Sequence, residues 1–144
     1  MRGRPELAQA YRAAWYEVTL PEGTPCRFRV GDRVHALEPL AGCGGWGWLT
    51  AFNPGSHLLP TAENARRHDG LCRIVASLGL SVLEASSGDD AGLWPVERGF
   101  CLLDVDRCRL QSLANDWQQA AFLHARPQEP VQLCWSDEPC PPGP

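Results

Sequence analysis

The sequence predicts a single α+β domain with a mainly antiparallel sheet, and three observations support this. The chain has 144 residues, the length of one ordinary domain. Hydrophobic residues make up 44%, enough for a buried core. Between residues 46 and 124 the predicted order is strand, helix, strand, strand, helix, strand. This order fits a ferredoxin-like β-α-β-β-α-β core, in which right-handed crossovers place the third strand between the first and second.

A helix and a hairpin are expected before this core. The helical pattern begins after Pro5, which suits a first turn, and its apolar positions are Leu7, Tyr11, Ala14 and Trp15. Residues 16–20 and 26–30 alternate as the two strands of a hairpin. Residues 31–45 show no periodicity, so we expect a loop with at most a short helical turn.

The first half of the core has clear start and stop signals. Residues 46–52 read as a strand that ends at the turn Asn53-Pro54-Gly55-Ser56. Thr61 is expected to cap the following helix, and Gly79 to end it. The buried stripe predicted for this helix is Leu71, Ile74, Val75 and Leu78. Residues 81–85 form the next predicted strand, and residues 86–92 a polar loop.

The second half completes the domain. Residues 100–105 are a strongly apolar strand, after which Asp106 is expected to cap a helix. Residues 120–124 and 131–135 read as the last two strands. We therefore expect one domain over residues 1–135 and a Pro-rich mobile tail over residues 136–144.

Composition limits the classes of function. All 13 basic residues are Arg, and with 17 acidic residues the net charge is −4, which makes nucleic acid an unlikely partner. No apolar stretch is long enough to span a membrane or to act as a signal sequence, which predicts a cytoplasmic protein. The seven cysteines form no Cys-x-x-Cys pair. We expect them to be reduced, with Cys72 and Cys101 on buried faces and Cys140 exposed.

Three short patterns carry no function on their own. Residues 42–47 spell Gly-x-Gly-x-x-Gly, but a strand follows instead of a helix, which favours a flexible segment before the strand over a dinucleotide site. Residues 98–105 resemble the start of an RNA-recognition strand but lack its stacking aromatics. His57, His68 and Asp69 are a weak metal candidate. Neither a metal nor a cofactor is predicted.

Four short stretches are more distinctive: Thr50-Ala51-Phe52-Asn53-Pro54-Gly55-Ser56, Glu63-Asn64, Trp94-Pro95-Val96-Glu97 and Gln119-Ala120-Ala121. In these stretches the sequence resembles the bacterial domain-of-unknown-function family 3293, over roughly residues 11–123. It departs from that family by having Phe52 where Trp is usual and by having Trp117 near the Gln. The resemblance implies important positions but no activity.

The predicted topology brings polar residues of these stretches to one rim of the sheet. The candidate ligand-binding residues are Asn53, Ser56, Asn64, Arg67, Trp94, Glu97 and Gln119. The helix N-terminus and Arg67, which is expected to approach Glu97 or Asn53, favour a small anionic ligand. The same residues also fit a purely structural polar network.

The sequence therefore predicts a small-ligand-binding or regulatory module. One alternative is an enzyme in which Glu97 is the general acid or base while Asn53 and Gln119 orient the substrate. Another is a protein-interaction module, or a homo-oligomer, that uses exposed aromatics such as Trp135. The sequence does not distinguish these three classes.

Overall fold

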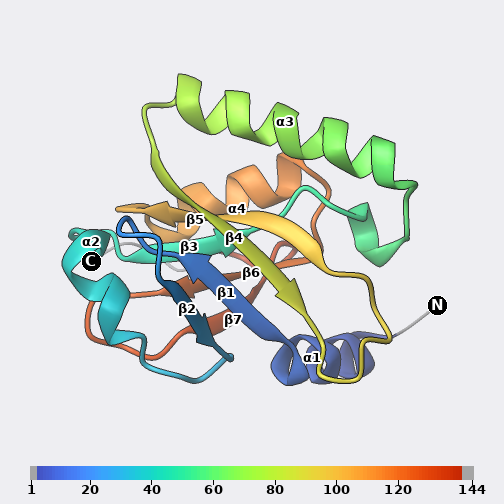
Figure 1. The fold of residues 1–144 in the computed structure, drawn as a ribbon, viewed down its shortest axis with the longest axis horizontal. Coiled ribbons are helices and arrows are strands. Elements are labelled where there is room, and N and C mark those ends of the chain that lie inside the picture. The colour runs from blue at the N-terminus through green and yellow to red at the C-terminus, as the bar shows by residue number, and fades with distance from the viewer. Residues whose placement is uncertain (1–2, 141–144) are drawn as a thin grey trace.

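The computed structural model describes residues 3–140. Its seven strands form one antiparallel sheet in the order β2-β1-β4-β5-β3-β6-β7 (Figure 1). The strands are β1 (Trp15–Thr19), β2 (Pro25–Phe28), β3 (Trp46–Leu49), β4 (Ser81–Gly88), β5 (Glu97–Leu103), β6 (Ala121–Ala125) and β7 (Gln132–Trp135). The helices are α1 (Arg4–Ala13), α2 (Glu38–Ala41), α3 (Thr61–Ser77) and α4 (Arg107–Asp116), with 3-10 turns η1 (His35–Leu37) and η2 (Pro54–Ser56).

The predicted α+β architecture with a single antiparallel sheet is confirmed. Strand β5 lies between β3 and β4, and β6 lies on the other side of β3. The N-terminal hairpin extends the sheet beyond β4, and β7 extends it beyond β6. Because β3 and β4 run in the same direction, the turn after β3, the start of α3 and the start of β5 meet at one end of the sheet.

The two faces of the sheet carry different cores. Leu49 on β3 packs with Leu71 of α3 and Leu110 of α4, so these two helices cover one face. Trp46 and Trp48 point to the opposite face, where they pack with the β1–β2 hairpin and with the segment around α2. Burying a large apolar side chain in either core contributes about 1.5–3 kcal/mol. In Figure 1, α3 lies at the top of the view with α4 below it, and α1 lies below the sheet.

Several predicted bounds were wrong, for local reasons. Strand β3 ends at Leu49, before residue 52, because the Thr50 hydroxyl donates to the Arg98 carbonyl (2.6 Å) and accepts from Phe52 N–H (3.0 Å). Residues 86–88, expected in a loop, continue β4 and pair with β1. Thr61 is the first helical residue of α3 and not its cap, which is Pro60. Asp106 does cap α4, since its carboxylate accepts from Arg109 N–H.

The buried stripe of α3 is rotated from the predicted one. Its buried residues are Asn64, His68, Leu71 and Val75. Ile74 and Leu78 are 42% and 44% exposed. Two polar residues lie in the buried stripe, so apolar periodicity alone gave the wrong orientation.

The glycines of residues 42–47 have a packing role that the expectation of a flexible segment missed. Gly45 has a φ of 81°, and a Cβ there would collide with the Ala125 carbonyl oxygen. A Cβ at Gly47 would collide with Leu110 of α4. These positions therefore allow close approach of backbone and helix.

The expectation of reduced cysteines was wrong for one pair. Cys108 of α4 and Cys140 form a disulfide, with their Cα atoms 5.5 Å apart. Cys72 is exposed, although a buried position was expected, whereas Cys101 is buried as expected. Cys140 looks remote in sequence, but the chain after β7 turns back along α4, and this brings the two thiols together.

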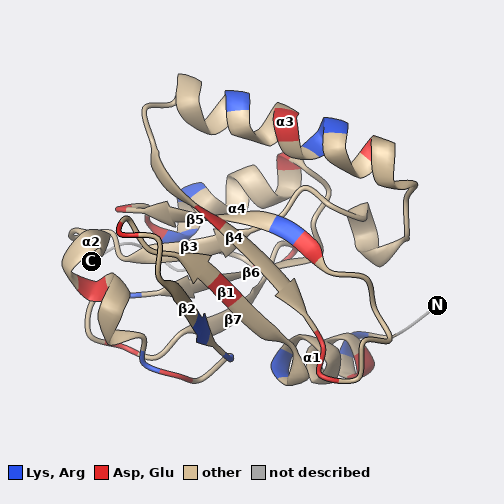
Figure 2. Cartoon of the chain, viewed as in Figure 1, with Lys and Arg blue, Asp and Glu red and all other residues tan. Residues whose placement is uncertain are grey.

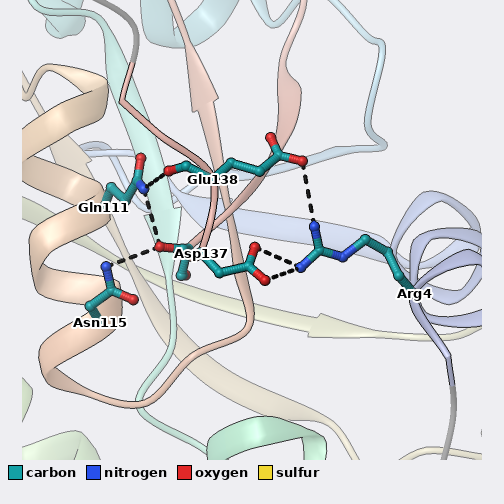
Figure 3. Close-up of polar contacts among 6 residues, drawn as sticks. Arg4, Gln111, Asn115, Asp137 and Glu138 are labelled. Atoms are coloured by element: carbon teal, nitrogen blue, oxygen red, sulfur yellow. Dashed lines mark hydrogen bonds and ion pairs between the residues drawn. The ribbon is translucent and has the colours of Figure 1, made fainter.

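The chain after β7 contacts both α4 and α1 (Figure 3). Asn115 donates to the Ser136 carbonyl (3.0 Å), and Arg4 donates to both carboxylate oxygens of Asp137 (2.6 and 2.5 Å). Of the predicted tail, residues 136–140 make these contacts, and residues 141–144 lie outside the described part of the chain. Trp135, expected to be exposed, is 9% exposed and packs against Tyr11.

Candidate functional site

A cavity of about 880 Å³ lies between α1, the β4–β5 loop and the sheet face that carries Trp48. Its walls are mostly apolar and aromatic, and α1 contributes Leu7, Ala10 and Tyr11. Five of the seven predicted site residues line it: Asn53, Ser56, Trp94, Glu97 and Gln119. A concave, largely apolar cavity with a few convergent polar groups is typical of a small-molecule site.

Glu97 is the central polar group of this cavity. It is the first residue of β5, and its Oε2 accepts from Asn53 Nδ2 (2.9 Å) and from Trp94 Nε1 (2.7 Å). Within residues 3–140, Oε1 has no hydrogen-bond partner. Burial raises the pKa of Glu97, and the two hydrogen bonds oppose that rise. The side chain thus offers one free oxygen at the cavity.

Asn64 fixes the orientation of Asn53. Its Oδ1 accepts from Asn53 N–H (2.9 Å), and its Nδ2 donates to Asn53 Oδ1 (2.8 Å). Leu59 N–H donates to the same Asn53 oxygen (2.9 Å), so the amide nitrogen of Asn53 is the end left for Glu97. Asn53 has a φ of 49°, a left-handed conformation that Asn tolerates better than most residues. Asn64 is therefore a buried positioning residue and not part of the cavity wall.

Gln119 and Arg67 hold the backbone around this turn. Gln119 Nε2 donates to the Phe52 carbonyl (3.0 Å), and Gly55 N–H donates to the Gln118 carbonyl (2.8 Å). Arg67 Nε donates to the Ala51 carbonyl (2.6 Å), and its terminal nitrogens donate to Gln118 Oε1 (3.2 Å). Its guanidinium also lies 5.4 Å from the Trp117 ring. Arg67 thus contacts backbone next to the site, in place of the expected side chains of Glu97 and Asn53.

Two tyrosines complete the site, and neither was predicted from the sequence as a site residue. The Tyr11 side chain is hydrogen-bonded to Ser56, and Tyr16 donates to the Tyr11 carbonyl (3.0 Å). Burial raises the pKa of both phenols, and the charge of Glu97 adds to each rise. Tyr11 was predicted to lie on the apolar face of its helix. Nothing in the sequence indicates that this face covers the far end of the sheet, so the signal was absent.

The cavity is acidic. Asp89, Asp90 and Glu97 line it, whereas no Arg among the described residues does. Asp90 pairs with Arg29 (2.8 Å), and Asp89 accepts from the N–H groups of Leu93 and Trp94. The charges of the lining therefore do not favour the anionic ligand that the sequence suggested.

The weak metal candidate is divided between two places. His57 lines the cavity, whereas His68 is a buried residue of α3 that stacks on Phe100 with ring centres 4.4 Å apart. Within residues 3–140 no group of three His, Cys, Asp or Glu side chains is arranged to hold a metal ion. The same part of the chain contains no helix with the length and hydrophobicity needed to cross a membrane.

Charges on the rest of the molecule are mixed. Figure 2 shows Arg and acidic residues interspersed along α3, with residues of both signs on other elements. This agrees with the small net charge of −4 and gives no reason to expect a polyanionic partner.

Residues 49–122 match the family model described as "Protein of unknown function (DUF3293)". The matched stretch contains Asn53, Asn64, Glu97 and Gln119, whereas α1 with Tyr11 lies outside it. No curated protein and no solved structure matches the chain. Because the match covers more than half of its 144 residues, this chain belongs to the DUF3293 family.

Proposed function

We propose that this protein binds a small, mainly apolar molecule in the cavity beneath α1, with Glu97 as its polar anchor. The observation that carries the proposal is the unpaired Oε1 of Glu97 in a cavity of about 880 Å³. Oε1 is not among the fully buried atoms, so a ligand in the cavity can reach it without breaking a hydrogen bond within the described part of the protein.

Support also comes from how the anchor is held. Asn64 orients Asn53, and Asn53 together with Trp94 holds Oε2 of Glu97. A binding group that is fixed before the ligand arrives loses less entropy when the complex forms. Gln119 and Arg67 add to this by fixing the backbone on either side of Asn53.

The neutral dye N-phenyl-1-naphthylamine tests the proposal, because it becomes fluorescent in apolar surroundings. The full chain is titrated with the dye beside two variants of α1. Ala10→Trp fills the cavity, since Ala10 lines it, whereas Gln9→Trp adds the same ring on the exposed side. We expect enhancement with the native chain and Gln9→Trp, and its loss in Ala10→Trp.

Equal enhancement in both variants would show that the dye binds elsewhere, and the proposed site would then be wrong. Circular dichroism of the two variants checks that each retains the fold. A native chain that gives no enhancement would also count against an apolar binding cavity.

A second candidate is catalysis with Glu97 as general acid or base. The observation that favours it is the combination of an open carboxylate oxygen and a pKa raised by burial. A bell-shaped or sigmoidal dependence of turnover on pH that disappears in Glu97→Gln would support it. Trp135 does not support the protein-interaction alternative, because its side chain is buried and the alternative needs an exposed aromatic.

The ferredoxin-like core, the bacterial origin and the cytoplasmic location are proposals as well. The strand order β4-β5-β3-β6 supports a ferredoxin-like core inside the larger sheet. A bacterial origin is consistent with the family that the sequence resembles. A cytoplasmic location stays a proposal, and the Cys108–Cys140 disulfide argues against a reducing compartment.

A further inference from the structure

Among residues 3–140, two carboxylates of the cavity lining, Asp89 and Glu97, have no cation, and of the two only Glu97 has an oxygen without a hydrogen-bond partner. Asp90 is paired with Arg29, and Asp89 accepts two backbone N–H groups. Arg98 follows Glu97 on β5, but it lies 3.7 Å from Glu84 on the side of the sheet that α3 covers. The other titratable groups that line the cavity are Tyr11, Tyr16 and His57. Within the described part of the chain, the carboxylate of Glu97 therefore has hydrogen-bond donors but no compensating positive charge.

The hydrogen bonds at Glu97 suit the ionised form. Asn53 Nδ2 and Trp94 Nε1 both donate to Oε2, and two N–H donors on one oxygen stabilise a carboxylate. Partial burial of a carboxylate without a cation has a cost, and a cation brought by a ligand would offset it. Oε1 is the atom at which such a cation would be bound.

The walls suit a cation that carries an apolar group. Tyr11, Tyr16, Trp48 and Trp94 all line the cavity. Aromatic faces attract cations by roughly 0.5–2 kcal/mol, and more strongly when water is excluded. They also bury the apolar part of a ligand, whereas a hydrated inorganic cation would gain little from them.

We infer that the ligand is a small organic ammonium ion, whose nitrogen pairs with Oε1 of Glu97 and whose apolar part lies among the aromatic side chains. The inference rests on the proposed function, since it names the class of molecule that this cavity takes. It replaces the anionic ligand suggested by Arg67, which is not among the lining residues.

Three probes of similar shape and different charge test the inference: 2-phenylethylammonium, 2-phenylethanol and phenylacetate. Their affinities for the full chain are measured by calorimetry at pH 7.5. We expect the ammonium ion to bind at least tenfold more tightly than the alcohol, and phenylacetate to bind most weakly. In Glu97→Gln the preference for the ammonium ion should fall to less than twofold, because Gln keeps an acceptor for Asn53 and Trp94 but has no charge.

Asp90→Asn is the matched control, because it removes another lining carboxylate, one that is already paired with Arg29. It should keep the tenfold preference. Equal binding of ammonium ion and alcohol to the native chain would overturn the inference while leaving an apolar binding cavity in place. Tighter binding of phenylacetate, or a preference that survives in Glu97→Gln, would also overturn it. Failure of the neutral dye to bind is the separate result that would overturn the proposed function.

Discussion

The side-chain amide of Asn53 donates to Oε2 of Glu97 over 2.9 Å, and only one orientation of the amide allows this bond. The amide oxygen already accepts from Asn64 Nδ2 and from Leu59 N–H. The orientation of a cavity-lining carboxylate is thus set by a residue of α3 that does not line the cavity. This relationship makes Asn64 testable as a positioning residue.

Asn64→Asp should lower the free energy of unfolding by about 1–3 kcal/mol, the usual cost of an unsatisfied buried polar group. The Asp can still accept from Asn53 N–H, but its second oxygen faces Asn53 Oδ1 and repels it. Urea unfolding measures the change. Asn115→Asp is the control, since Asn115 also donates from its amide but is exposed. Similar losses in the two variants would contradict the positioning role.

Glu97→Gln should raise the free energy of unfolding at pH 7 by roughly 1 kcal/mol, because functional groups are often held at a cost in stability. Burial raises the pKa of Glu97 in the folded chain, so the unfolded chain loses this proton at lower pH. Stability therefore falls as the pH rises through the interval between the two pKa values. The gain from the substitution should vanish below the ordinary Glu pKa of 4.5. A gain that grows as the pH falls would contradict this sign.

His124 should have the opposite pH dependence. It is buried, its Nε2 lies 2.9 Å from the Val105 carbonyl, and burial lowers its pKa below the ordinary 6.5. Below that pH the unfolded chain takes up a proton that the folded chain does not. The free energy of unfolding therefore decreases as the pH is lowered. In His124→Gln, which keeps a donor for Val105, unfolding should depend less steeply on pH between about 7.5 and 5. An unchanged or steeper slope would refute the assignment.

The positions of the site residues could be predicted because they depend on strand order and direction. The turn at Asn53 follows from Pro and Gly, and the apolar run 100–105 predicts the strand that Glu97 precedes, although β5 in fact begins at Glu97 itself. Asn64 follows from its place in the first turn of a helix that starts at the same end. The direct contacts Asn64–Asn53–Glu97 bear out the prediction that these residues lie together.

The cavity itself could not be predicted, because it depends on how α1 docks. Tyr11 reaches Ser56 from 45 positions earlier in the chain, and Arg4 of the same helix pairs with Asp137 at the other end. Such contacts between distant segments leave no periodic signal. The direction of Arg67 was missed for a related reason. Its partners are the Ala51 carbonyl and the Gln118 side-chain amide, and the pattern of apolar and polar residues does not show where these groups lie.

Reduction of the Cys108–Cys140 disulfide should lower the free energy of unfolding by about 2–4 kcal/mol, as expected for closure of a loop of this length. The two residues are 32 positions apart. Cys140→Ser should show the same loss without reductant and no further loss with it. Cys72→Ser is the control, because Cys72 is exposed and unpaired. A native chain whose unfolding does not respond to reductant would contradict the disulfide.

Arg67 and Arg66 are neighbours on α3 with different predicted effects. Arg67 donates to the Ala51 carbonyl and to Gln118 Oε1, and so joins the segments that lead to Asn53 and Gln119. Arg66 is exposed. Arg67→Ala should lower the free energy of unfolding by about 1.5–3 kcal/mol, because charged hydrogen bonds to buried carbonyl groups are lost. Arg66→Ala should change it by less than about 0.5 kcal/mol.

Both variants should retain the order of affinity for the ammonium, alcohol and carboxylate probes, since neither arginine lines the cavity. If Arg67→Ala selectively weakened phenylacetate binding while stability stayed unchanged, Arg67 would be an anion-binding residue and its structural role would be wrong.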